Sequence, residues 1–491
     1  MNKINGQNLK TLESDTEYKN CDFYLAEKEY LITDSNFTNC NFKSKVTFRE
    51  IRGCSFHNCV FSSEFIVNLP SKHLTELPKE ITHLTDLTHL VLSDCYKLKE
   101  LPKELGQLTN LTHLHLSDCY KLKKLPKEVG QLINLTHLVL SHCYKIKRLP
   151  KEIGQLSNLT HLRLPYCPNL KNLSKKIGRL TNLVHLDCYY LKNLPKEVGQ
   201  LTNLTHLHLS YCSNLKKISG EIIKLAQHAN LTHLHLSYVD KIPKEIKQLN
   251  IITHLDLSKV EPTTILKEIG KITSLTHLNL QSKKLKRLPK EIGLLTNLTY
   301  LNLSHCDELT ELPKEIGQLV NLAHLDLSHC KKLGELPREV ELLTKLTHLN
   351  LYLNNLGELP REIGLLINLT YLNLTLNKLR ELPKEIGLLT NLTHLELGTN
   401  KLYKIPKEIG KLTHLTKLDL SSNHLISLPQ EIGQLSKLVV LSLSSNNIKE
   451  LPESIRQLVR LACLILDRHT FKKSYIDSLV KSLPNCIYLV G

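Results

Sequence analysis

The sequence predicts an α/β solenoid, in which short parallel β-strands stack and short helical or 3-10 segments connect them. Three observations lead to this fold class. A unit of 23 or 24 residues recurs along most of the chain, as in LTHLHLSDCYKLKKLPKEVGQLIN (111–134) and LTHLVLSHCYKIKRLPKEIGQLSN (135–158). Leucine dominates the apolar residues, with one Met and no Trp in 491 residues. Each unit also begins with a strand pattern and continues into a turn, as expected of a stacked array.

Within a unit, the apolar positions predict one strand and one return segment. Leu114 and Leu116 have the period of two that is typical of a strand with one face on a core. Pro126 lacks a backbone donor and fixes φ, so it suits the start of the returning segment. We expect residues 127–132 to form a short helical or 3-10 segment on the outer side, with Val129 pointing inward.

A single unit is too small to fold alone. Burying its core side chains contributes about 1.5–3 kcal/mol each. Ordering its backbone costs about 1–2 kcal/mol per residue, so stability requires neighbouring units that share the core. Seventeen units are apparent, and they start at residues 87, 111, 135, 159, 183, 204, 231, 252, 275, 298, 322, 346, 369, 392, 415, 438 and 461. Strands on one side and bulkier segments on the other predict a horseshoe with a concave strand face and a convex helical face.

The repeat motif also resembles a known family. LxxLxLxxNxLxxLPxEIGxLxxL resembles the leucine-rich repeats of plant intracellular Ras-group proteins, Ras-pathway scaffolds and many bacterial repeat proteins. The variant with Cys, LxxLxLxxCxxLxxLP, is similar to the repeats of plant disease-resistance proteins. The resemblance covers about residues 87–484. It implies a leucine-rich-repeat fold that binds proteins, with a small GTPase or another signalling protein as the partner, although the family binds many unlike partners.

One repeat position holds Cys in early units and Asn in later ones: Cys95, Cys119, Cys143, Cys167, Cys212, Cys306 and Cys330, then Asn354, Asn377, Asn400, Asn423 and Asn446. The family resemblance implies that this residue points inward and bonds to the backbone of adjoining turns. Asn offers donors and an acceptor for that role, and a thiol is weaker. A zinc site would need close pairs such as CxxC, which this region lacks. Cys188 replaces a core leucine and should be buried.

The two ends differ from the array. We predict an N-terminal segment over 1–20, a β-solenoid cap over 21–66, a leucine-rich array of about 17–18 repeats of 21–27 residues over 67–471, and a C-terminal cap over 472–491. The N-terminal cap resembles pentapeptide repeats, with inward centres at Ile32, Phe37, Phe42, Ile51, Phe56, Phe61 and Ile66. Its cysteines are expected to pack there, with metal binding as the alternative: Cys21, Cys40, Cys54 and Cys59. The C-terminal cap should hold a helix over 473–483, ended by Pro484, and a strand over 486–490.

The concave face carries the candidate binding residues. In LxxLxL the second and third x point away from the core, and the second x is His in twelve units. Twelve histidines hold it: His89, His113, His137, His161, His185, His206, His233, His254, His277, His324, His348 and His394. We place the contact zone in the irregular middle units, 204–330. The predicted protein-binding residues are His206, His208, His233, His235, His254, Asp256, His277, Asn279, Tyr300, Asn302, His324, Asp326, His348 and Tyr371. The next exposed column includes Tyr166, Tyr190, Tyr211 and Tyr238.

Three interpretations of the histidines stay open. They are a repeated packing feature with stacked rings, a recognition surface, or a set of His-Leu-His metal ligands, for which two histidines are an incomplete site. Closely spaced imidazoles disfavour one another's protonation, so binding or stability should change between about pH 5 and 7. The third-x column is His- and Arg-containing up to His235 and mostly Asp, Glu or Asn afterwards.

The sequence favours a non-catalytic scaffold that binds a partner protein in intracellular signalling. GxxxxGK(S/T), GxSxG and HExxH motifs are absent, so we expect no enzyme, cofactor or small-molecule substrate. One alternative is a bacterial effector-like protein that acts on a host signalling protein. Another is binding of nucleic acid or an anionic surface, drawn from the net charge of +17. Most lysines lie in turns, such as Lys97, Lys99 and Lys103, which argues against nucleic acid in the concave face.

The sequence also bears on location. No stretch approaches the roughly 20 apolar residues of a membrane span, and the start MNKINGQNLK lacks the apolar region of a signal peptide. Fourteen cysteines without a disulfide-like spacing suit a reducing compartment. We therefore expect a cytoplasmic protein, with export to a host cell without a classical signal peptide as the alternative.

Overall fold

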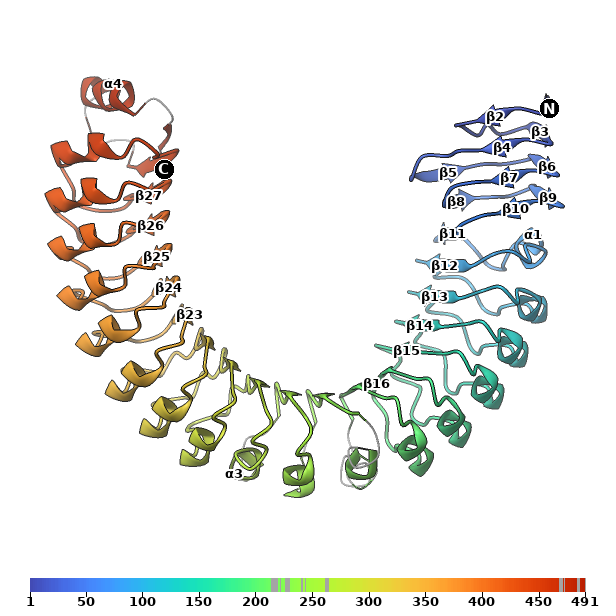
Figure 1. Cartoon of the computed structure of the whole chain (residues 1–491), viewed down its shortest axis with the longest axis horizontal. Helices are drawn as coiled ribbons and strands as arrows, with labels where there is room; N and C mark the ends of the chain where they lie inside the picture. The colour runs from blue at the N-terminus through green and yellow to red at the C-terminus, as the bar shows by residue number, and fades with distance from the viewer. Residues whose placement is uncertain are drawn as a thin grey trace. The chain divides into compact units, whose positions relative to one another are not determined.

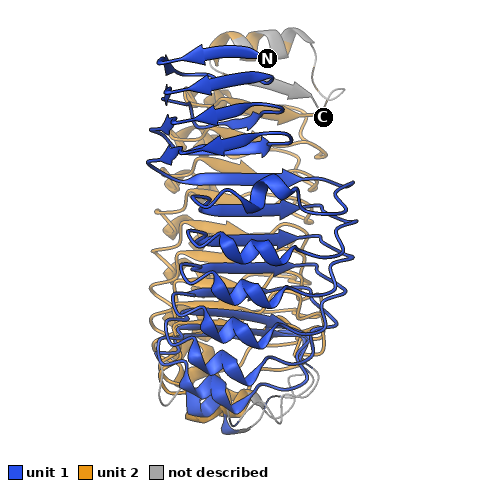
Figure 2. Ribbon diagram, turned by 90° about the vertical axis from the view of Figure 1, so that its right-hand side faces the viewer, with its two compact units in different colours: residues 1–245 blue, residues 246–491 orange. Residues whose placement is uncertain are grey.

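The computed structural model describes residues 1–212, 220, 222–225, 230–239, 242, 244–260, 265–467, 471, 473–483 and 486–490. The chain divides into two compact units, residues 1–245 and 246–491 (Figure 2). Both contain a sheet of parallel strands with short helices packed on the opposite side (Figure 1). The predicted fold class, a leucine-rich-repeat solenoid of parallel strands and 3-10 segments, is confirmed.

Unit 1 begins with parallel strands that form three ribbons. The first ribbon contains β1 (Asn2–Asn5), β3 (Thr16–Lys19), β6 (Asn36–Thr38) and β9 (Ser55–His57). The second contains β2 (Asn8–Leu9), β4 (Asp22–Phe23), β7 (Asn41–Phe42) and β10 (Val60–Phe61). The third contains β5 (Glu29–Leu31), β8 (Val46–Glu50) and β11 (Phe65–Pro70). The parallel turns thus extend into residues 1–20, which the sequence set apart as a separate segment.

Stacked aromatic rings fill these N-terminal turns. The Phe37 ring stacks between Tyr18 and Phe56, with centroids 4.9 and 4.7 Å away. The Phe42 ring stacks in the same way on Phe23 at 4.7 Å and on Phe61 at 4.6 Å. Such ladders arise because parallel in-register strands place equivalent side chains one above another.

The predicted inward centres of this region hold with one correction. Ile32, Phe37, Phe42 and Ile51 are buried, and Phe56 and Phe61 are half-buried within the ring stacks. The prediction for Ile66 is wrong, because Phe65 and Val67 are fully buried and Ile66 lies between them on the other face of β11. In β11 every second side chain is buried, whereas in the preceding turns every fifth residue points inward. The change occurs where the long sheet of repeat strands begins.

From β11 onward the third ribbon of unit 1 gains one strand per repeat: β12 (His89–Ser93), β13 (His113–Ser117), β14 (His137–Ser141), β15 (His161–Leu164), β16 (His185–Tyr189), β17 (His206–Ser210) and β18 (His233–His235). The register pairs Leu114 with Leu138 and Leu116 with Leu140. All four leucines are fully buried, as the period of two predicts.

The returning segments of unit 1 are short helices: α1 (Lys79–Thr82), η1 (Lys103–Gln107), η2 (Lys127–Gln131), η3 (Lys151–Gln155), η4 (Lys175–Arg179) and η5 (Lys196–Gln200). Pro126 precedes η2 with φ of −65° and ψ of 151°, an extended conformation that proline favours. Val129 and Leu132 are fully buried. The predicted 3-10 return over 127–132 is therefore confirmed.

Unit 2 repeats the arrangement. Its strands are β19 (His254–Asp256), β20 (His277–Asn279), β21 (Tyr300–Asn302), β22 (His324–Asp326), β23 (His348–Asn350), β24 (Tyr371–Asn373), β25 (His394–Glu396), β26 (Lys417–Asp419), β27 (Val440–Ser442), β28 (Cys463–Leu466) and β29 (Ile487–Val490). Its helices are α3 (Ile265–Ile269), η7 (Lys290–Leu294), η8 (Lys314–Gln318), η9 (Arg338–Leu342), η10 (Arg361–Leu365), η11 (Lys384–Leu388), η12 (Lys407–Lys411), η13 (Gln430–Gln434), η14 (Glu453–Gln457) and α4 (Lys473–Ser482). The helix η6 (Lys244–Gln248) contains the division between the units.

Strands of unit 2 are mostly shorter than those of unit 1. The difference comes from the residue at the third x of LxxLxL, which is mostly Asp or Asn in unit 2. The Oδ1 atom of Asp326 accepts the backbone N–H of Ser328 at 2.8 Å, and the Oδ1 atom of Asn302 accepts that of Ser304 at 2.9 Å. An Asp or Asn side chain that bonds the backbone two residues later turns the chain out of the strand. Residues such as His115 cannot do this, and β13 runs for five residues.

The C-terminal segment contains the predicted helix and strand. A helix over 473–483 was expected, and α4 covers Lys473–Ser482 with Leu479 and Leu483 buried. The expected last strand is β29, which pairs in parallel with β28. Pro484, the predicted stop of the helix, lies outside the described residues.

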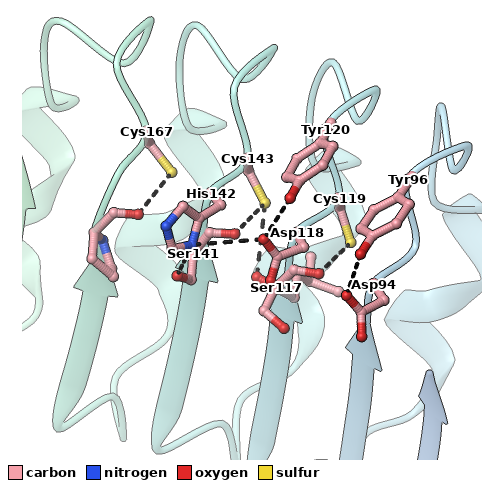
Figure 3. Close-up of polar contacts among 12 residues, drawn as sticks. Asp94, Tyr96, Ser117, Asp118, Cys119, Tyr120, Ser141, His142, Cys143 and Cys167 are labelled. Atoms are coloured by element: carbon pink, nitrogen blue, oxygen red, sulfur yellow. Dashed lines mark hydrogen bonds and ion pairs between the residues drawn. The ribbon is translucent and has the colours of Figure 1, made fainter. Parts of the chain in front are cut away.

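The Cys and Asn position is structural, as predicted. The Cys143 thiol donates to the carbonyls of Ser141 and Leu116 at 3.5 and 3.7 Å (Figure 3). Asn377 does more: its Nδ2 donates to Leu351 O at 2.8 Å and Leu374 O at 3.0 Å, and its Oδ1 accepts Leu356 N–H at 3.1 Å. Cys188, placed in the core by the sequence, is fully buried.

Candidate protein-binding face

We call the side of each sheet that points away from the leucine core the sheet face. In unit 1 it carries a column of stacked imidazoles. Ring centroids of neighbouring histidines lie 4.0–4.3 Å apart along His89, His113, His137, His161, His185, His206 and His233. The column exists because the parallel register aligns the first residue of each strand, as in His113 with His137. The rings are half-buried, so one edge of each faces solvent.

A threonine holds six of these seven rings, and the exception is His185, which follows Val184. Thr112 Oγ1 lies 2.9 Å from His113 Nδ1 and 3.0 Å from the carbonyl oxygen of Thr88 in the preceding repeat. The hydroxyl has one proton, and a carbonyl can only accept, so the proton goes to Thr88 O. His113 Nδ1 must then be the donor to Thr112 Oγ1. This fixes the Nδ1–H tautomer and leaves the lone pair on Nε2, the ring nitrogen farther from the backbone.

The same contacts recur along the chain. Thr136 bonds His137 at 2.9 Å and Thr160 bonds His161 at 2.9 Å, while both hydroxyls also donate to a threonine carbonyl of the preceding repeat. In unit 2, Thr276 lies 2.9 Å from His277 Nδ1. The structure therefore presents a row of acceptor nitrogens in a fixed orientation.

The column resists protonation. Burial, and then the neighbouring imidazoles His89 and His137, lower the pKa of His113 to about 4. Burial and neighbouring histidines likewise lower the pKa of His161 to about 4. Burial also lowers the pKa of His185 and His206 from 6.5. The stacked rings are thus neutral at physiological pH, and the sheet face of unit 1 accepts hydrogen bonds.

A second column in unit 1 contains the predicted residues His208 and His235. Their rings stack at 3.8 Å, and His208 Nε2 lies 2.7 Å from Ser210 Oγ. Earlier in the column, Arg163 Nε donates to Asp187 Oδ2 at 2.7 Å. This ion pair joins adjacent strands and offsets the positive charge that the sequence assigned to this part of the column.

In unit 2 the sheet face mixes imidazole, phenol and carboxylate groups. Centroids of successive rings along His254, His277, Tyr300, His324, His348 and Tyr371 lie 4.0, 5.7, 4.8, 5.2 and 5.9 Å apart. The neighbouring column contains Asp256, Asn279, Asn302 and Asp326. In each of these residues, the side-chain Oδ1 accepts a hydrogen bond from the backbone N–H two residues later. The second carboxylate oxygen of Asp256 accepts the Asn279 Nδ2–H at 3.1 Å. Asp326 adds a further carboxylate on β22, so this face also accepts hydrogen bonds and is acidic.

The structure divides the predicted site residues into two groups. His206, His208, His233 and His235 lie on β17 and β18 of unit 1, and the remaining ten lie on β19–β24 of unit 2. All are half-buried on the sheet face except His348, which is exposed. Parts of the predicted contact zone, residues 213–219, 226–229 and 261–264, lie outside the described residues.

Sequence reasoning missed a ladder where the strands of unit 1 end. Tyr120 Oη donates to Asp118 Oδ1 at 2.9 Å, and Tyr96 Oη donates to Asp94 Oδ1 at 2.6 Å (Figure 3). The rings of Tyr96, Tyr120 and Tyr144 stack at 4.9 and 5.0 Å. The bond to Asp118 raises the pKa of Tyr120 to about 12. The repeated triplet Asp-Cys-Tyr was the available signal.

The predicted tyrosine column adopts an unusual backbone. Tyr166, Tyr190, Tyr211 and Tyr238 have φ between 54° and 64°, the left-handed region that bulky residues rarely occupy. Tyr211 stacks on Tyr190 at 5.0 Å and on Tyr238 at 4.3 Å. Tyr238 is 46% exposed. The same repeat position has positive φ where it holds Asp118, Leu353 or Ser445, so the left-handed backbone belongs to the repeat turn and not to the tyrosines.

Neither a metal-binding cluster nor a membrane-spanning helix is found among the described residues. Among the described residues, no group of three or more His, Cys, Asp or Glu side chains is placed to hold a metal ion. This includes the described His-Leu-His pairs and the N-terminal cysteines, of which Cys40 instead donates to Tyr18 O at 3.6 Å. Within the described ranges, no helix has the length and apolar character that crossing a membrane requires.

Comparisons with known proteins agree with the fold. The family model "Leucine-rich repeat region" matches residues 116–241, 325–423 and 406–484, and "R13L1/DRL21 LRRs" matches 196–330. A leucine-rich-repeat protein of Leptospira interrogans is 34% identical, with a TM-score of 0.60 over 87% of this chain and 96% of that chain. The Toll–Spatzle complex of Drosophila gives 18% identity and a TM-score of 0.63 over 95% of this chain and 65% of that chain. No curated protein matches. The chain belongs to the leucine-rich-repeat family.

Proposed function

We propose that the chain is a non-catalytic scaffold that binds a partner protein on the sheet face of its repeats, in cytoplasmic signalling. Leucine-rich repeats are a common protein-interaction scaffold, and solenoids of this kind use their extended inner surfaces for binding. The observation that carries the proposal is the threonine-held column of His113 and its neighbours. Rings that are already fixed lose little freedom on binding, which favours affinity.

The chemistry of the face indicates the chemistry of the partner. Neutral imidazoles in unit 1 offer Nε2 lone pairs, and Asp326 in unit 2 offers a carboxylate oxygen. A complementary partner surface would supply donors, above all Arg and Lys, with aromatic or aliphatic groups between them. A partner surface that is instead rich in hydrogen-bond acceptors and carboxylates would be repelled by the acidic sheet face of unit 2.

An effector-like role and a small GTPase partner are supported only by similarity to other proteins. The 34% identical relative from Leptospira interrogans favours the bacterial branch of the resemblance, and with it an effector-like role on a host signalling protein. The Ras-group resemblance favours a small GTPase as the partner. Toll, whose fold is similar, is bound to Spatzle in its solved structure, which supports protein binding as a use of the fold.

The proposal is tested by capture of partners with matched variants. One variant changes the sheet face of unit 1, at His206, His208, His233 and His235 to Ala. A second changes that of unit 2, at His277, Tyr300, His324 and Tyr371 to Ala. A control changes four exposed residues on the helices η7–η10 to Ala: Leu294, Gln318, Leu342 and Leu365.

The partner captured by the wild type is purified and its affinity for each folded variant is measured. We expect at least one sheet-face variant to lose roughly 2 kcal/mol or more of binding free energy, with the control unchanged. Equal affinity for both sheet-face variants and the wild type would contradict the proposal.

We also propose that residues 21–66 act as a pentapeptide-like cap on the leucine core and that residues 472–491 cap the other end. The five-residue step from Phe37 to Phe42, with each ring in its own stack, supports this. Phe42→Ala should cost about 3–5 kcal/mol because it empties a fully buried site. Hydrogen exchange should then rise over the capped strands β11 and β12, and unchanged exchange there would refute capping.

A further inference from the structure

A groove crosses three consecutive repeats of unit 1, away from the sheet face. Its volume is about 750 Å³, and its lining comes from residues 100–103, 123–128 and 147–150. These segments lead into η1, η2 and η3. Leu101, Leu125, Pro126 and Pro150 form its apolar part, and the other lining residues are charged.

Six cations and two carboxylates line this groove. The carboxylates are Glu100 and Glu128, and the cations are Lys103, Lys123, Lys124, Lys127, Lys147 and Arg148. All six cations are exposed. The ion pairs found among the described residues of unit 1 involve other side chains. Six cations and two carboxylates give the groove lining a net charge of +4.

Equivalent positions in unit 2 are balanced, which makes this charge a local feature and not a property of the repeat. The residue before Leu-Pro is Glu100, Lys124 and Arg148 in successive repeats of the groove, and Arg287, Glu311, Glu335, Glu358 and Glu381 in successive repeats of unit 2. There, Arg287 pairs with Glu311 at 3.2 Å and Lys404 pairs with Glu381 at 3.3 Å across neighbouring repeats. In unit 1, Lys124 and Arg148 occupy equivalent positions of successive turns, so their like charges repel, and an anionic ligand would relieve the repulsion.

The lining also limits which anion fits. It contains no aromatic side chain, so it has no platform on which unpaired bases could stack, as single-stranded nucleic acid binding normally requires. Cations repeat at each turn along the groove, which matches a linear chain that carries an anionic group at short intervals. The groove is a recess of about 750 Å³ across three repeats, unlike a flat patch that would meet a membrane. We propose that this groove binds a single chain of a sulfated polysaccharide, an assignment that rests on export of the chain, the alternative to a cytoplasmic location.

The test compares two variants of the full chain that lose the same charge. The groove variant carries Lys123→Ala, Lys124→Ala, Lys147→Ala and Arg148→Ala. The control carries four exposed cations of unit 2 changed to Ala, none of them in a described ion pair: Lys314, Arg338, Arg361 and Lys384. The probe is a labelled heparin oligosaccharide at physiological salt, and thermal unfolding checks that both variants fold.

We expect the groove variant to lose affinity by about tenfold or more, and the control by less than about twofold, because four direct contacts are removed in only one of them. A groove variant with Gln in place of Ala retains longer side chains and serves if the alanine variant unfolds. Equal losses in both variants would show attraction to net charge and overturn the proposal.

Two other results would also overturn it. If heparin fails to bind the wild type at physiological salt, the groove does not bind sulfated polysaccharides. Single-stranded DNA of equal charge that binds the groove more tightly than heparin would assign the site to nucleic acid. The groove is separate from the sheet face, so neither result affects the proposed protein binding.

Discussion

The hydroxyl of Thr112 lies 2.9 Å from Nδ1 of His113, and it has no proton left to give to that ring. Its proton goes to a backbone carbonyl of the preceding repeat. The threonine thus acts as an acceptor toward the ring and sets its tautomer. Because the pair repeats along the sheet, a local hydrogen bond determines the chemistry of a whole surface.

The first prediction concerns this tautomer. At neutral pH the His113 ring should carry its proton on Nδ1, which correlation spectra of the ring nitrogens can establish. In Thr112→Val the acceptor is gone, so a mixture of tautomers is expected. His57, an exposed ring outside the column, serves as an internal reference and should be unaffected. A proton on Nε2 of His113 in the wild type would refute the assignment.

The second prediction is acid sensitivity of unit 1. Unfolded histidines take up protons as the pH falls through about 6.5, whereas the folded His113 and His161 do so only at about 4. The unfolded state therefore binds more protons between these values, and the free energy of unfolding decreases as the pH falls through this window. Above about 6.5 the stabilisation is fully present.

Denaturant midpoints measured across that range should shift downward with acidity. A variant with His113→Gln and His161→Gln should show a shallower dependence, because it lacks two of the groups with the largest pKa shifts in the column. An unchanged slope in this variant would exclude the column as the source. The window extends below the range of about pH 5–7 expected from sequence, because burial adds to the repulsion between rings.

The third prediction concerns Asn377. Replacing it with Ala leaves the buried Leu351 and Leu374 carbonyls and the Leu356 N–H without this partner, and we expect a loss of roughly 2–4 kcal/mol. Asn377→Cys should be milder, since a thiol still donates weakly. Lys378→Ala, exposed and adjacent, is the control and should change stability little. Chemical denaturation of the three variants tests the order.

The fourth prediction compares two glycines of one repeat. A Cβ atom on Gly364 would lie 2.6 Å from Glu385 O and 2.8 Å from Glu385 Cβ in the next 3-10 helix. Gly364→Ala should therefore force backbone shifts that cost about 1–3 kcal/mol. A Cβ atom on Gly357 meets nothing within 4 Å, so Gly357→Ala should be neutral or slightly stabilising. Similar melting temperatures for the two variants would contradict this account of the Gly in the repeat motif.

Much of the fold was predictable because one short pattern repeats. Leu114 and Leu116 fixed the buried face of a strand, Pro126 fixed the start of the return, and the position of Cys143 and Asn377 fixed an inward polar contact. In-register stacking then followed, since it is the arrangement that lets each unit bury its leucines. The period of two alone was enough to predict on which side of the sheet the histidines lie.

Other features depended on contacts between repeats that no single unit specifies. The tautomer of His113 depends on a carbonyl of Thr88 in the preceding repeat. The left-handed backbone of Tyr166 is set by the turn and not by the preference of tyrosine. Ile66 was misplaced because the spacing changes from five to two where β11 joins the long sheet. The basic groove required knowing that residues 123–128 and 147–150 line one surface.

The most direct test of the central claim places a photo-reactive amino acid at one of two positions in consecutive repeats of unit 2. One is His324 on the sheet face, at the start of β22, and the other is Gln318, the last residue of η8. With the purified partner present, the account predicts efficient cross-linking from position 324 and little from position 318. Efficient cross-linking from position 318 alone would place the partner on the helices and contradict binding on the sheet face.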